Sequence, residues 1–293
     1  MADAWEGERV ARWIASASSL EPQLAPVSDA LFEVAALRPG ERVLDIGCGT
    51  GPTTHRAAAM VGPTGAVTGL DVSAEMLDAA RASAVADATT AATDWVAADA
   101  THWAGPADLF DVVISRFGVM FFDDPAAAFA NLAALTRPGG RLVVAVWSHR
   151  RDNPLFEIPL AAALAVRDGF RLPPVDVPSA YLGAFSLSEP DDVRDLLRGN
   201  GWADIEIDER RLRLPLAGGR PLDEAARSTL EVGPTRVVTD DMDPSQKAAV
   251  VVAIAEALLP HQVGSAVVLD ASIHIVSAGR ASVADAGAGA HRG

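Results

Sequence analysis

Between residues 41 and 147 the chain alternates short apolar runs with longer stretches that are rich in alanine. The apolar runs contain many β-branched residues and are bounded by glycine, proline and aspartate, a pattern that predicts strands. Five strands are predicted, at residues 42–46, 66–71, 94–98, 110–115 and 141–147. Because helix or turn signals follow each of them, the alternation is typical of βαβ units in a parallel sheet.

Helix boundaries are marked by proline and by short polar residues. Pro52 follows the first strand at a position where a first helical residue needs no N–H partner. Further along, Asp124 is placed to cap a helix that begins at Pro125. That helix is predicted to stop, and the chain to turn into the fifth strand, at Arg137-Pro138-Gly139-Gly140.

The segments on either side of this region have other patterns. Apolar residues recur at helical spacing over residues 5–20 and 27–37, which predicts two lead-in helices. After Trp147, residues 191–201 predict a helix that ends at glycine, and residues 205–214 and 266–277 predict two antiparallel strands. Residues 150–181 and the mostly helical stretch 223–262 are expected to form insertions that cap the sheet. The Ala/Gly-rich tail from residue 282 is expected to be disordered.

The charge balance narrows the range of partners. The 293 residues include 24 basic and 39 acidic side chains, a formal net charge of -15, which disfavours nucleic acid and anionic membranes as partners. The most apolar run, residues 248–259, is interrupted by Glu256 and is shorter than the roughly 20 residues that a membrane-spanning helix needs. The start of the chain does not resemble a signal peptide, and the single cysteine excludes an internal disulfide. We therefore expect a cytoplasmic protein that acts on a small molecule.

The first strand runs into a glycine-rich loop, Asp45-Ile46-Gly47-Cys48-Gly49-Thr50-Gly51. Glycines between a strand and a helix let the backbone approach a nucleotide closely. The dinucleotide fingerprint G-x-G-x-x-G would require glycine at position 52, which is Pro52, so a nicotinamide oxidoreductase is a weaker alternative.

Two acidic residues end the next two strands, Asp71 in Gly69-Leu70-Asp71-Val72 and Asp99 in Ala97-Ala98-Asp99-Ala100. A lone aspartate at a strand end is more often a turn or helix cap than a ligand. Here the loop and both acids fall at the carboxyl ends of parallel strands, where open α/β sheets bind ligands. The combination predicts a nucleoside site at this edge, with Asp71 accepting hydrogen bonds from ribose hydroxyls.

The D-x-G-x-G-x-G loop resembles motif I of the class I S-adenosylmethionine-dependent methyltransferases. The segment from Ser115 to Phe122, followed by Arg137-Pro138-Gly139-Gly140, resembles more specifically the bacterial branch related to ubiquinone and menaquinone biosynthesis methyltransferases. The resemblance covers residues 5–147, about half of the chain, with a weaker continuation at 185–207.

The resemblance implies an α/β fold with a Rossmann-like, mostly parallel seven-stranded sheet, helices on both faces, an antiparallel last strand and a helical cap. The expected organisation is lead-in helices that cover the cofactor site (1–40), a cofactor-binding core (41–150), the remaining strands with a substrate-binding cap (151–281), and the tail (282–293). The implied cofactor is S-adenosyl-L-methionine, with S-adenosyl-L-homocysteine as product.

The resemblance also places the cofactor. Asp99 would face the adenine amino group, Val72 and Met76 would pack on adenine, although Met76 also suits a core position, and the backbone from Ser115 to Phe117 would face the methionine end. The complete predicted cofactor set is Trp13, Asp45, Gly47, Cys48, Gly49, Gly51, Thr53, Asp71, Val72, Met76, Ala98, Asp99, Ala100, Ser115, Arg116 and Phe117.

Methyl transfer from a sulfonium mainly demands positioning, and some acceptors gain from a base. His149, just after the fifth strand, is the candidate base, against the alternative of a solvated turn residue; His261 is a weaker candidate. Cys48 is interpreted as structural. No metal is expected, because capping explains Asp124. Arg116 either attracts an anionic acceptor or pairs with an acid near the loop.

Phe121, Trp147 and Phe156 are predicted to line the acceptor pocket, with ordinary core packing as the alternative. The favoured function is methyl transfer to an O or C atom of a small molecule, such as a quinone, a polyketide or another secondary metabolite. Alternatives are a non-methylating reaction such as cyclisation with the cofactor bound structurally, and a non-catalytic binding module. The oligomeric state stays open, with a homodimer as one option.

Overall fold

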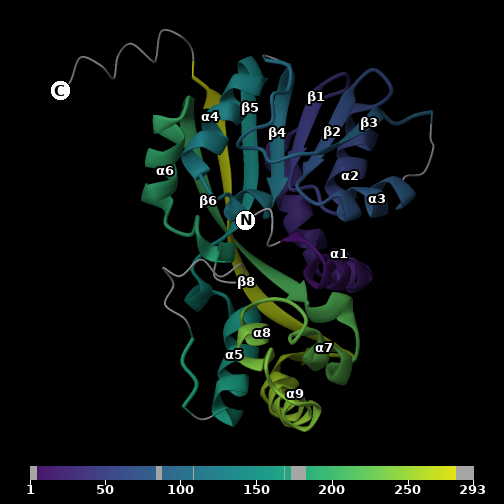
Figure 1. Ribbon diagram of the computed structural model, residues 1–293, viewed down its shortest axis with the longest axis vertical. Helices are drawn as coiled ribbons and strands as arrows, with labels where there is room; N and C mark the ends of the chain where they lie inside the picture. Colours follow the sequence, from purple (N-terminus) through teal and green to yellow (C-terminus); the bar gives the residue numbers. More distant parts are fainter. Residues whose placement is uncertain (1–4, 84–87, 108, 168, 173–182, 282–293) are drawn as a thin grey trace, which may run out of the picture.

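Seven strands form the central sheet of the protein, in the order β3-β2-β1-β4-β5-β8-β6 (Figure 1). The computed structural model describes residues 5–83, 88–107, 109–167, 169–172 and 183–281. Strands β1 to β5 pair with their neighbours in parallel, whereas β8 runs antiparallel to both β5 and β6. The two-residue strand β7 (Gln262–Val263) pairs only with β8. The predicted Rossmann-like α/β sheet with an antiparallel last strand is confirmed.

The first four strands lie close to their predicted positions. They are β1 (Arg42–Ile46), β2 (Ala66–Asp71), β3 (Ala92–Ala97) and β4 (Phe110–Arg116). In β1 the four consecutive residues after Arg42 are all buried. Because successive side chains of a strand point to opposite faces, β1 is covered on both sides, as the continuous apolar pattern requires.

Strand β5 (Thr136–Trp147) begins five residues earlier than predicted, and α4 (Pro125–Leu135) ends at the residue before it. The predicted turn at residues 137–140 is therefore wrong: these residues form an irregular start of the strand. Phe110 pairs with Thr136 and Val112 with Arg141, so β5 carries extra residues opposite β4. A Cβ on Gly140 would lie 2.9 Å from the carbonyl oxygen of Asp111, so this close approach requires glycine. The predicted cap of α4 is confirmed, since Asp124 accepts a hydrogen bond from the N–H of Ala127.

One continuous helix, α1 (Glu8–Ala35), replaces the two predicted lead-in helices. Pro22 and Pro26 lie inside it, between the two stretches of helical apolar spacing, although proline disfavours a helix interior. The residues between them have tertiary partners: Leu24 is buried, and the side-chain oxygen of Gln23 accepts a hydrogen bond from the N–H of Ala217 at 2.8 Å. These contacts stabilise the helix where local propensity opposes it.

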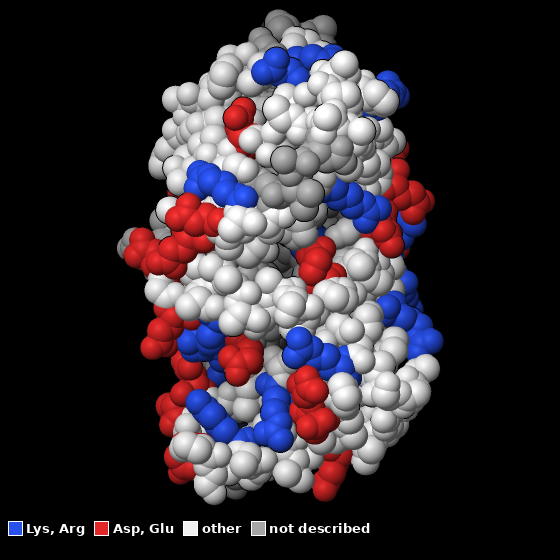
Figure 2. Space-filling model, turned by 90° about the vertical axis from the view of Figure 1, so that its right-hand side faces the viewer, with Lys and Arg blue, Asp and Glu red and all other residues white. Residues whose placement is uncertain are grey.

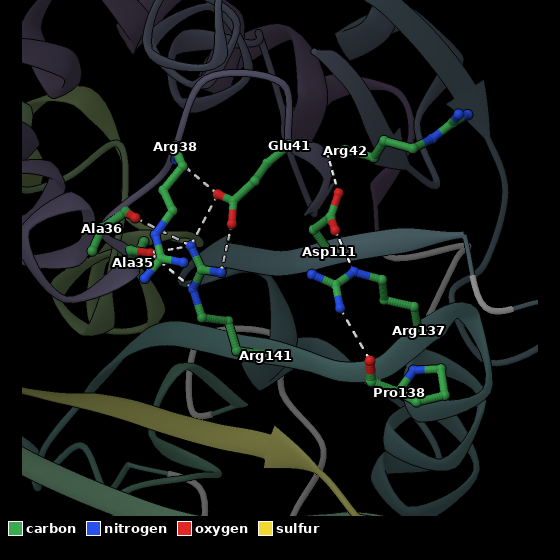
Figure 3. Close-up of polar contacts among 9 residues, drawn as sticks. All are labelled: Ala35, Ala36, Arg38, Glu41, Arg42, Asp111, Arg137, Pro138 and Arg141. Carbon is green, nitrogen blue, oxygen red and sulfur yellow. Dashed lines mark hydrogen bonds and ion pairs between the residues drawn. The ribbon is translucent and has the colours of Figure 1, made fainter.

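A polar network fixes the C-terminal end of α1 to the edge of the sheet at which β1 and β4 begin (Figure 3). The guanidinium of Arg141 donates hydrogen bonds to the carbonyl oxygens of Ala35 and Ala36 and to the carboxylate of Glu41. Asp111 accepts hydrogen bonds from the N–H of Arg42 and from the side chain of Arg137. These contacts hold only the C-terminal end of α1. Its N-terminal half lies over the opposite edge of the sheet, and contacts made by the middle of the helix determine its position there.

The remaining helices of the core alternate with the strands. Helices α2 (Pro52–Val61) and α3 (Ala74–Ser83) contact β1, β2 and β3, whereas α4 contacts β5 and α6 (Pro190–Gly199), which in turn contacts β6. Trp202, at the start of β6 (Trp202–Pro215), is fully buried, and its indole N–H donates to the carbonyl oxygen of Phe129 in α4. Helix α6 thus occupies the position predicted for a helix at 191–201.

The cap is built on strands that extend past the sheet. Strand β8 (Ala266–Arg280) pairs with β5 only from Ile273 onward, while its pairing with β6 begins at Val268. Around this extension lie the helices at the lower end of Figure 1. They are α5 (Pro154–Val166), α7 (Leu222–Ser228), α8 (Pro234–Thr239) and α9 (Pro244–Leu258). Both strands are longer than the predicted 205–214 and 266–277.

Short 3-10 helices connect these elements: η2 (Gly118–Phe121), η3 (Arg150–Asp152), η4 (Gly183–Phe185), η5 (Leu216–Gly219) and η6 (Leu259–His261). Part of the predicted insertion, residues 173–182, lies outside the described residues, as does the tail from 282. In the described part of the chain, no helix is long and apolar enough to cross a membrane.

Candidate active site

A cleft opens where β1 and β4 end side by side. Strands β2 and β3 lie beyond β1 on one side of this point, and β5 lies beyond β4 on the other. It is therefore the topological switch point, where open α/β sheets bind ligands. The cleft holds about 820 Å³ of empty space, including space open to solvent. Its walls are Trp5, Trp13, Ile46, Gly47, Gly49, Leu70, Asp71, Val72, Met76, Asp99, Ala100, Arg116, Phe117, Gly118, Phe121, Phe122 and Asp123. Ten of the sixteen predicted cofactor residues are among these walls.

The glycine loop and the loop after β4 touch each other through their backbones. A Cβ on Gly47 would lie 2.6 Å from the Cα of Gly118, and a Cβ on Gly118 would lie 2.5 Å from the carbonyl oxygen of Ile46. Gly49 differs, because no atom lies within 4 Å of the position of its Cβ. Gly47 therefore serves the packing of the two loops, whereas Gly49 leaves open space at the cleft.

Asp71 at the end of β2 supports the glycine loop and faces the cleft. Its Oδ2 accepts the N–H of Gly49 and its Oδ1 accepts the N–H of Ser73, both at 2.9 Å. Burial raises the pKa of Asp71, and these backbone hydrogen bonds oppose the rise. Each carboxylate oxygen retains acceptor capacity toward the cleft, since a carboxylate offers about four acceptor sites.

Asp45 lies beneath the loop and is fully buried. The hydroxyl groups of Thr53 and Thr54 each donate to its Oδ2 at 2.7 Å, and its Oδ1 has no hydrogen-bond partner among the described residues. Burial raises the pKa of Asp45 to about 6, against the two threonine hydrogen bonds, which lower it. Asp45 and Thr53 do not line this cleft, so the two predicted residues anchor the loop to the start of α2.

Asp99 begins a turn that forms the third side of the cleft. Its Oδ1 accepts the N–H of Thr101 at 2.7 Å, so it has the turn role expected of a strand-end aspartate as well as a place in the wall. Asn131 of α4 holds this turn, because its side-chain amide donates to the carbonyl oxygens of Ala100 (2.8 Å) and Trp103 (3.0 Å). No motif in the sequence marks Asn131, because only the packing of α4 brings it to its partners.

Arg116 pairs with an acid, one of its two predicted roles. Its guanidinium forms two hydrogen bonds with the carboxylate of Glu21, at 2.7 and 2.8 Å, and a third with Ser28. The side chain is 10% exposed. A bidentate pair in a nearly buried place fixes geometry as well as charge. Arg116 therefore joins the middle of α1 to the end of β4.

The remaining predicted cofactor residues have mixed positions. Val72 and Met76 line the cleft, and Met76 is also buried, as a core position requires. Ser115 is buried and its hydroxyl donates to the carbonyl oxygen of Ile46. Ala98 lines none of the cavities at this edge. Cys48 and Thr53 border a neighbouring hollow, shared with Trp13, Gly47, Gly49, Arg116 and Phe117. Gly51 lies against the ring of Trp95, which is 2.7 Å from the position that a Cβ on Gly51 would take.

Cys48 has the features of a structural residue. It is buried, and burial raises the pKa of its thiol, followed by the charges of Asp45 and Asp71. A thiol that is hard to ionise is a poor nucleophile. Among the described residues, no group of three or more His, Cys, Asp and Glu side chains is arranged to hold a metal ion.

A second, aromatic cavity adjoins the cleft, and we call it the aromatic pocket. Trp5, Trp13, Phe117 and Phe121 belong to the walls of both spaces. The other residues that line the aromatic pocket are Arg9, Arg12, Leu20, Gln23, Leu24, Met120, Trp147, Phe156, Ala184, Phe185, Glu231, Val232, Gly233 and Pro234. All three predicted acceptor-pocket residues, Phe121, Trp147 and Phe156, are in this set.

Several rings of the aromatic pocket contact one another in a row. Phe117 and Trp147 stack with centroids 4.1 Å apart and planes 12° apart, and Phe156 meets Trp147 edge to face at 5.0 Å. Phe117 has a positive φ of 69°, an unusual backbone conformation for a bulky residue. Its N–H donates to the carbonyl oxygen of Ala145, and its stacked ring divides the cleft from the aromatic pocket. Such strain persists only where the surroundings enforce it.

The structure does not bring His149 into this arrangement. His149 lines neither the cleft nor the aromatic pocket, and its Nε2 lies 3.1 Å from Oε1 of Glu189. His261 lies beside a separate cavity between α5 and β8. Sequence reasoning missed Trp5, Arg9, Arg12 and Phe185, which reach the aromatic pocket from the N-terminus and from η4. A stripe of large or charged residues near the N-terminus was the available signal for the first three.

Residues 43–140 match the protein family described as methyltransferase domain. The chain is 30% identical over 243 residues to nocamycin O-methyltransferase of Saccharothrix syringae, which covers 82% of this chain and 85% of that enzyme. It is 35% identical over 147 residues to the ubiquinone/menaquinone biosynthesis C-methyltransferase of Ectopseudomonas mendocina, covering 47% of this chain and 57% of that one. The chain thus spans little more than half the length of this second relative.

Solved structures share the fold. A phosphoethanolamine N-methyltransferase 2 of Haemonchus contortus, solved with S-adenosylhomocysteine, is similar with a TM-score of 0.52 and 17% identity, covering 88% of this chain and 53% of that one. A protein that converts a disulfide bond into a thioacetal group during echinomycin biosynthesis is similar with a TM-score of 0.53 and 24% identity, covering 90% and 86%. At these identities the similarity concerns the fold.

Proposed function

The chain belongs to the class I S-adenosylmethionine-dependent methyltransferases, and from this premise we propose that it methylates an O or C atom of a small, flat, apolar molecule held in the aromatic pocket. The observation that carries the proposal is the shared wall of Trp5, Trp13, Phe117 and Phe121. A methyl donor in the cleft and an acceptor in the aromatic pocket would meet at these rings. The aromatic pocket also holds about 820 Å³ of empty space, including space open to solvent, and most of its walls are apolar side chains, as is usual for small-molecule sites.

The residues of the cleft suit S-adenosylmethionine. Gly49 leaves space where any side chain would intrude, and the Asp71 carboxylate stands beside it, ready to accept hydrogen bonds from two ribose hydroxyls. Val72 and Met76 provide apolar contacts for adenine, and Asp99 is placed at the same end of the cleft. These residues would hold the nucleoside, and the loop from Ser115 to Phe117 would hold the methionine part.

The bound cofactor supplies a methyl group on a sulfonium, whose carbon–sulfur bond breaks as the acceptor forms its new bond to that carbon. The protein's own contribution is to position the acceptor and exclude water. The stacked rings of Phe117 and Trp147 form a flat, rigid surface for this purpose. The nocamycin enzyme is by its name an O-methyltransferase, which supports an oxygen atom as the acceptor here.

Two measurements test this proposal. Calorimetry should detect saturable binding of S-adenosylhomocysteine and none of NAD; the reverse result would reject the cofactor site. Incubation with S-adenosylmethionine labelled in its methyl group and a panel of quinols, phenols and acidic polyketides should then give a labelled product by mass spectrometry. A product isomeric with its substrate, unlabelled, would instead favour the non-methylating alternative.

A further inference from the structure

A second cavity continues the aromatic pocket, and we call it the annex. It lies between α1, α5, α7, α8 and η5, and holds about 490 Å³ of empty space, including space open to solvent. The two spaces share five wall residues, Leu20, Gln23, Phe156, Val232 and Pro234. A molecule bound in the aromatic pocket can therefore extend into the annex.

Hydroxyl groups and one amide give the annex a polar but uncharged wall. The hydroxyl groups belong to Ser16, Ser19, Ser228, Thr229 and Thr235, and the amide to Gln23. None of the described residues that line the annex is charged, whereas charged side chains of both signs are spread over the face of the molecule in Figure 2. An ionic group in the annex would have no opposite charge on its walls, so the annex suits neutral groups that contain oxygen.

Gln23 lies where the two spaces meet, with its side-chain amide held in one orientation. Its Oε1 accepts the N–H of Ala217 at 2.8 Å, while its Nε2 has no hydrogen-bond partner among the described residues. The residue is only 8% exposed. Buried amide donors are normally paired, because an unpaired one costs stability. The Nε2 of Gln23 is therefore available to donate to a bound molecule.

The backbone around Ala217 shows that this orientation is built into the fold. Ala217 has a φ of 52°, a left-handed conformation that costs energy in a residue other than glycine. A Cβ on the next residue, Gly218, would lie 2.8 Å from the carbonyl oxygen of Ser19, so η5 packs directly against α1. This packing holds the Ala217 N–H against Gln23 and thereby fixes the direction of Nε2.

Thr235 of α8 brings a second available donor to the annex. It is 3% exposed, and its hydroxyl group has no hydrogen-bond partner among the described residues. Ser19, Ser228 and Thr229 differ, because their hydroxyl groups already donate to the carbonyl oxygens three residues earlier. Their oxygens can still accept a hydrogen bond. The annex thus offers donors at Gln23 and Thr235 and acceptors at the other hydroxyl groups.

We propose that the methyl acceptor is an elongated molecule with a flat, apolar part in the aromatic pocket and an uncharged arm in the annex. The arm carries carbonyl and hydroxyl oxygens, and Gln23 and Thr235 recognise it. This inference rests on the proposed function, because it assigns the adjoining aromatic pocket to the acceptor. Nε2 of Gln23 and Oγ1 of Thr235 donate to oxygens of the arm, while the oxygens of Ser228 and Thr229 accept from its hydroxyl groups.

Isosteric probes test the proposal without knowledge of the natural acceptor. Each ketone is paired with the alkene in which a CH₂ group replaces the carbonyl oxygen. The pairs are 2-acetylnaphthalene with 2-isopropenylnaphthalene, and 4-(2-naphthyl)butan-2-one with 2-(3-methylbut-3-enyl)naphthalene, so that the carbonyl is placed at two distances from the rings. Calorimetry with S-adenosylhomocysteine bound, at about pH 8.5 where a glutamate side chain is ionised, gives the ratio of ketone to alkene affinity for each pair.

The variant Gln23→Glu keeps an acceptor for the Ala217 N–H and replaces the available donor by a carboxylate oxygen, which repels a carbonyl oxygen. In the pair whose carbonyl reaches Gln23, the ratio should fall at least about tenfold. Gln246→Glu is the matched control, since the side chain of Gln246 also accepts a backbone N–H, that of Asp243 at 3.0 Å. Gln246 is exposed and lines neither space, so this control should retain the ratio.

Thr235→Val removes the second donor and keeps the shape of the side chain, and the ratio should fall about threefold to tenfold. Thr239→Val is its control, one turn later in the same helix and also buried, but lining neither space. A ratio that is unchanged in both Gln23→Glu and Thr235→Val would overturn the proposal and mean that the annex holds only water. Failure of all four probes to bind the unaltered protein would instead reject the aromatic pocket as the acceptor site, so the two failures are distinguishable.

Discussion

Replacement of Asp45 by Asn should remove a pH dependence of stability that the fold imposes through this buried carboxyl group. Asp45 is fully buried, two hydroxyl groups donate to Oδ2, and Oδ1 has no partner among the described residues. Desolvation therefore outweighs the hydrogen bonds and raises its pKa to about 6 from 3.8. Asparagine has nearly the same shape and never ionises.

The raised pKa sets both the sign and the size of the effect. Because the folded protein holds the proton more tightly than the unfolded chain, the contribution of Asp45 to stability is fully present below about pH 4 and is lost as the pH rises through about 6. A rise from 3.8 to about 6 corresponds to about 3 kcal/mol, at about 1.4 kcal/mol per pH unit. About 2 kcal/mol of this falls between roughly pH 4.5 and 8.

Urea unfolding of both proteins across this pH range, followed by tryptophan fluorescence, measures the difference in the free energy of unfolding. The value for Asp45→Asn minus that for the unaltered protein should increase by about 2 kcal/mol from about pH 4.5 to 8. Asp111→Asn is the contrasting control: burial raises the pKa of Asp111, but hydrogen bonds from Arg42 and Arg137 outweigh it and lower the pKa overall. Its difference should stay nearly constant over the same range. A constant difference for Asp45→Asn would refute the reasoning.

Three further predictions concern cofactor binding, measured by calorimetry with S-adenosylhomocysteine. Asp71→Ala should weaken binding by about 1 to 3 kcal/mol, because charged hydrogen bonds to the ribose are lost; unchanged affinity would place the ribose elsewhere. Gly49→Ala should abolish binding, because the new methyl group would occupy the cleft. Gly264→Ala is the control, since Gly264 has a similar positive φ and equally open surroundings but lies far from the cleft, and the melting temperature should fall no more in Gly49→Ala than in this control. Equal binding by both variants would contradict the prediction. Asn131→Ala should weaken binding by about 1 to 2 kcal/mol, because the turn at Ala100 loses the hydrogen bonds from the Asn131 side chain. Normal affinity would mean that the turn keeps its conformation without Asn131.

The sequence was most informative where local chemistry decides the structure. β1 and β2 have their predicted bounds, because a strand with a buried face between turn residues leaves little freedom in register. The cap of α4 at Asp124 was equally predictable. In contrast, the continuity of α1 across Pro22 and Pro26 depends on partners that lie far away in the sequence, and the apolar spacing alone predicted two helices.

The acceptor side of the site was less predictable for the same reason. His149 was chosen from its place after β5, but the regular strand ends at Trp147 and the imidazole pairs with Glu189 near the start of α6. Trp147 does line the aromatic pocket, yet two of the rings beside it, Trp5 and Phe185, come from opposite halves of the chain. Only the packed fold brings these residues together, so spacing could not reveal them.

Two hydrogen-bonded contacts on one turn of α1 connect the core of the protein with its cap. Glu21 binds Arg116 at the end of β4, and Gln23 accepts the N–H of Ala217 in η5, at the far end of β6. The same stretch of α1 lines the aromatic pocket, and Trp13 of that helix also lines the cleft. We therefore expect a change in the cap to alter the aromatic pocket through the position of α1, while the glycine loop keeps its own contact with Asp71. This separation allows the acceptor preference to change without rebuilding the cofactor loop.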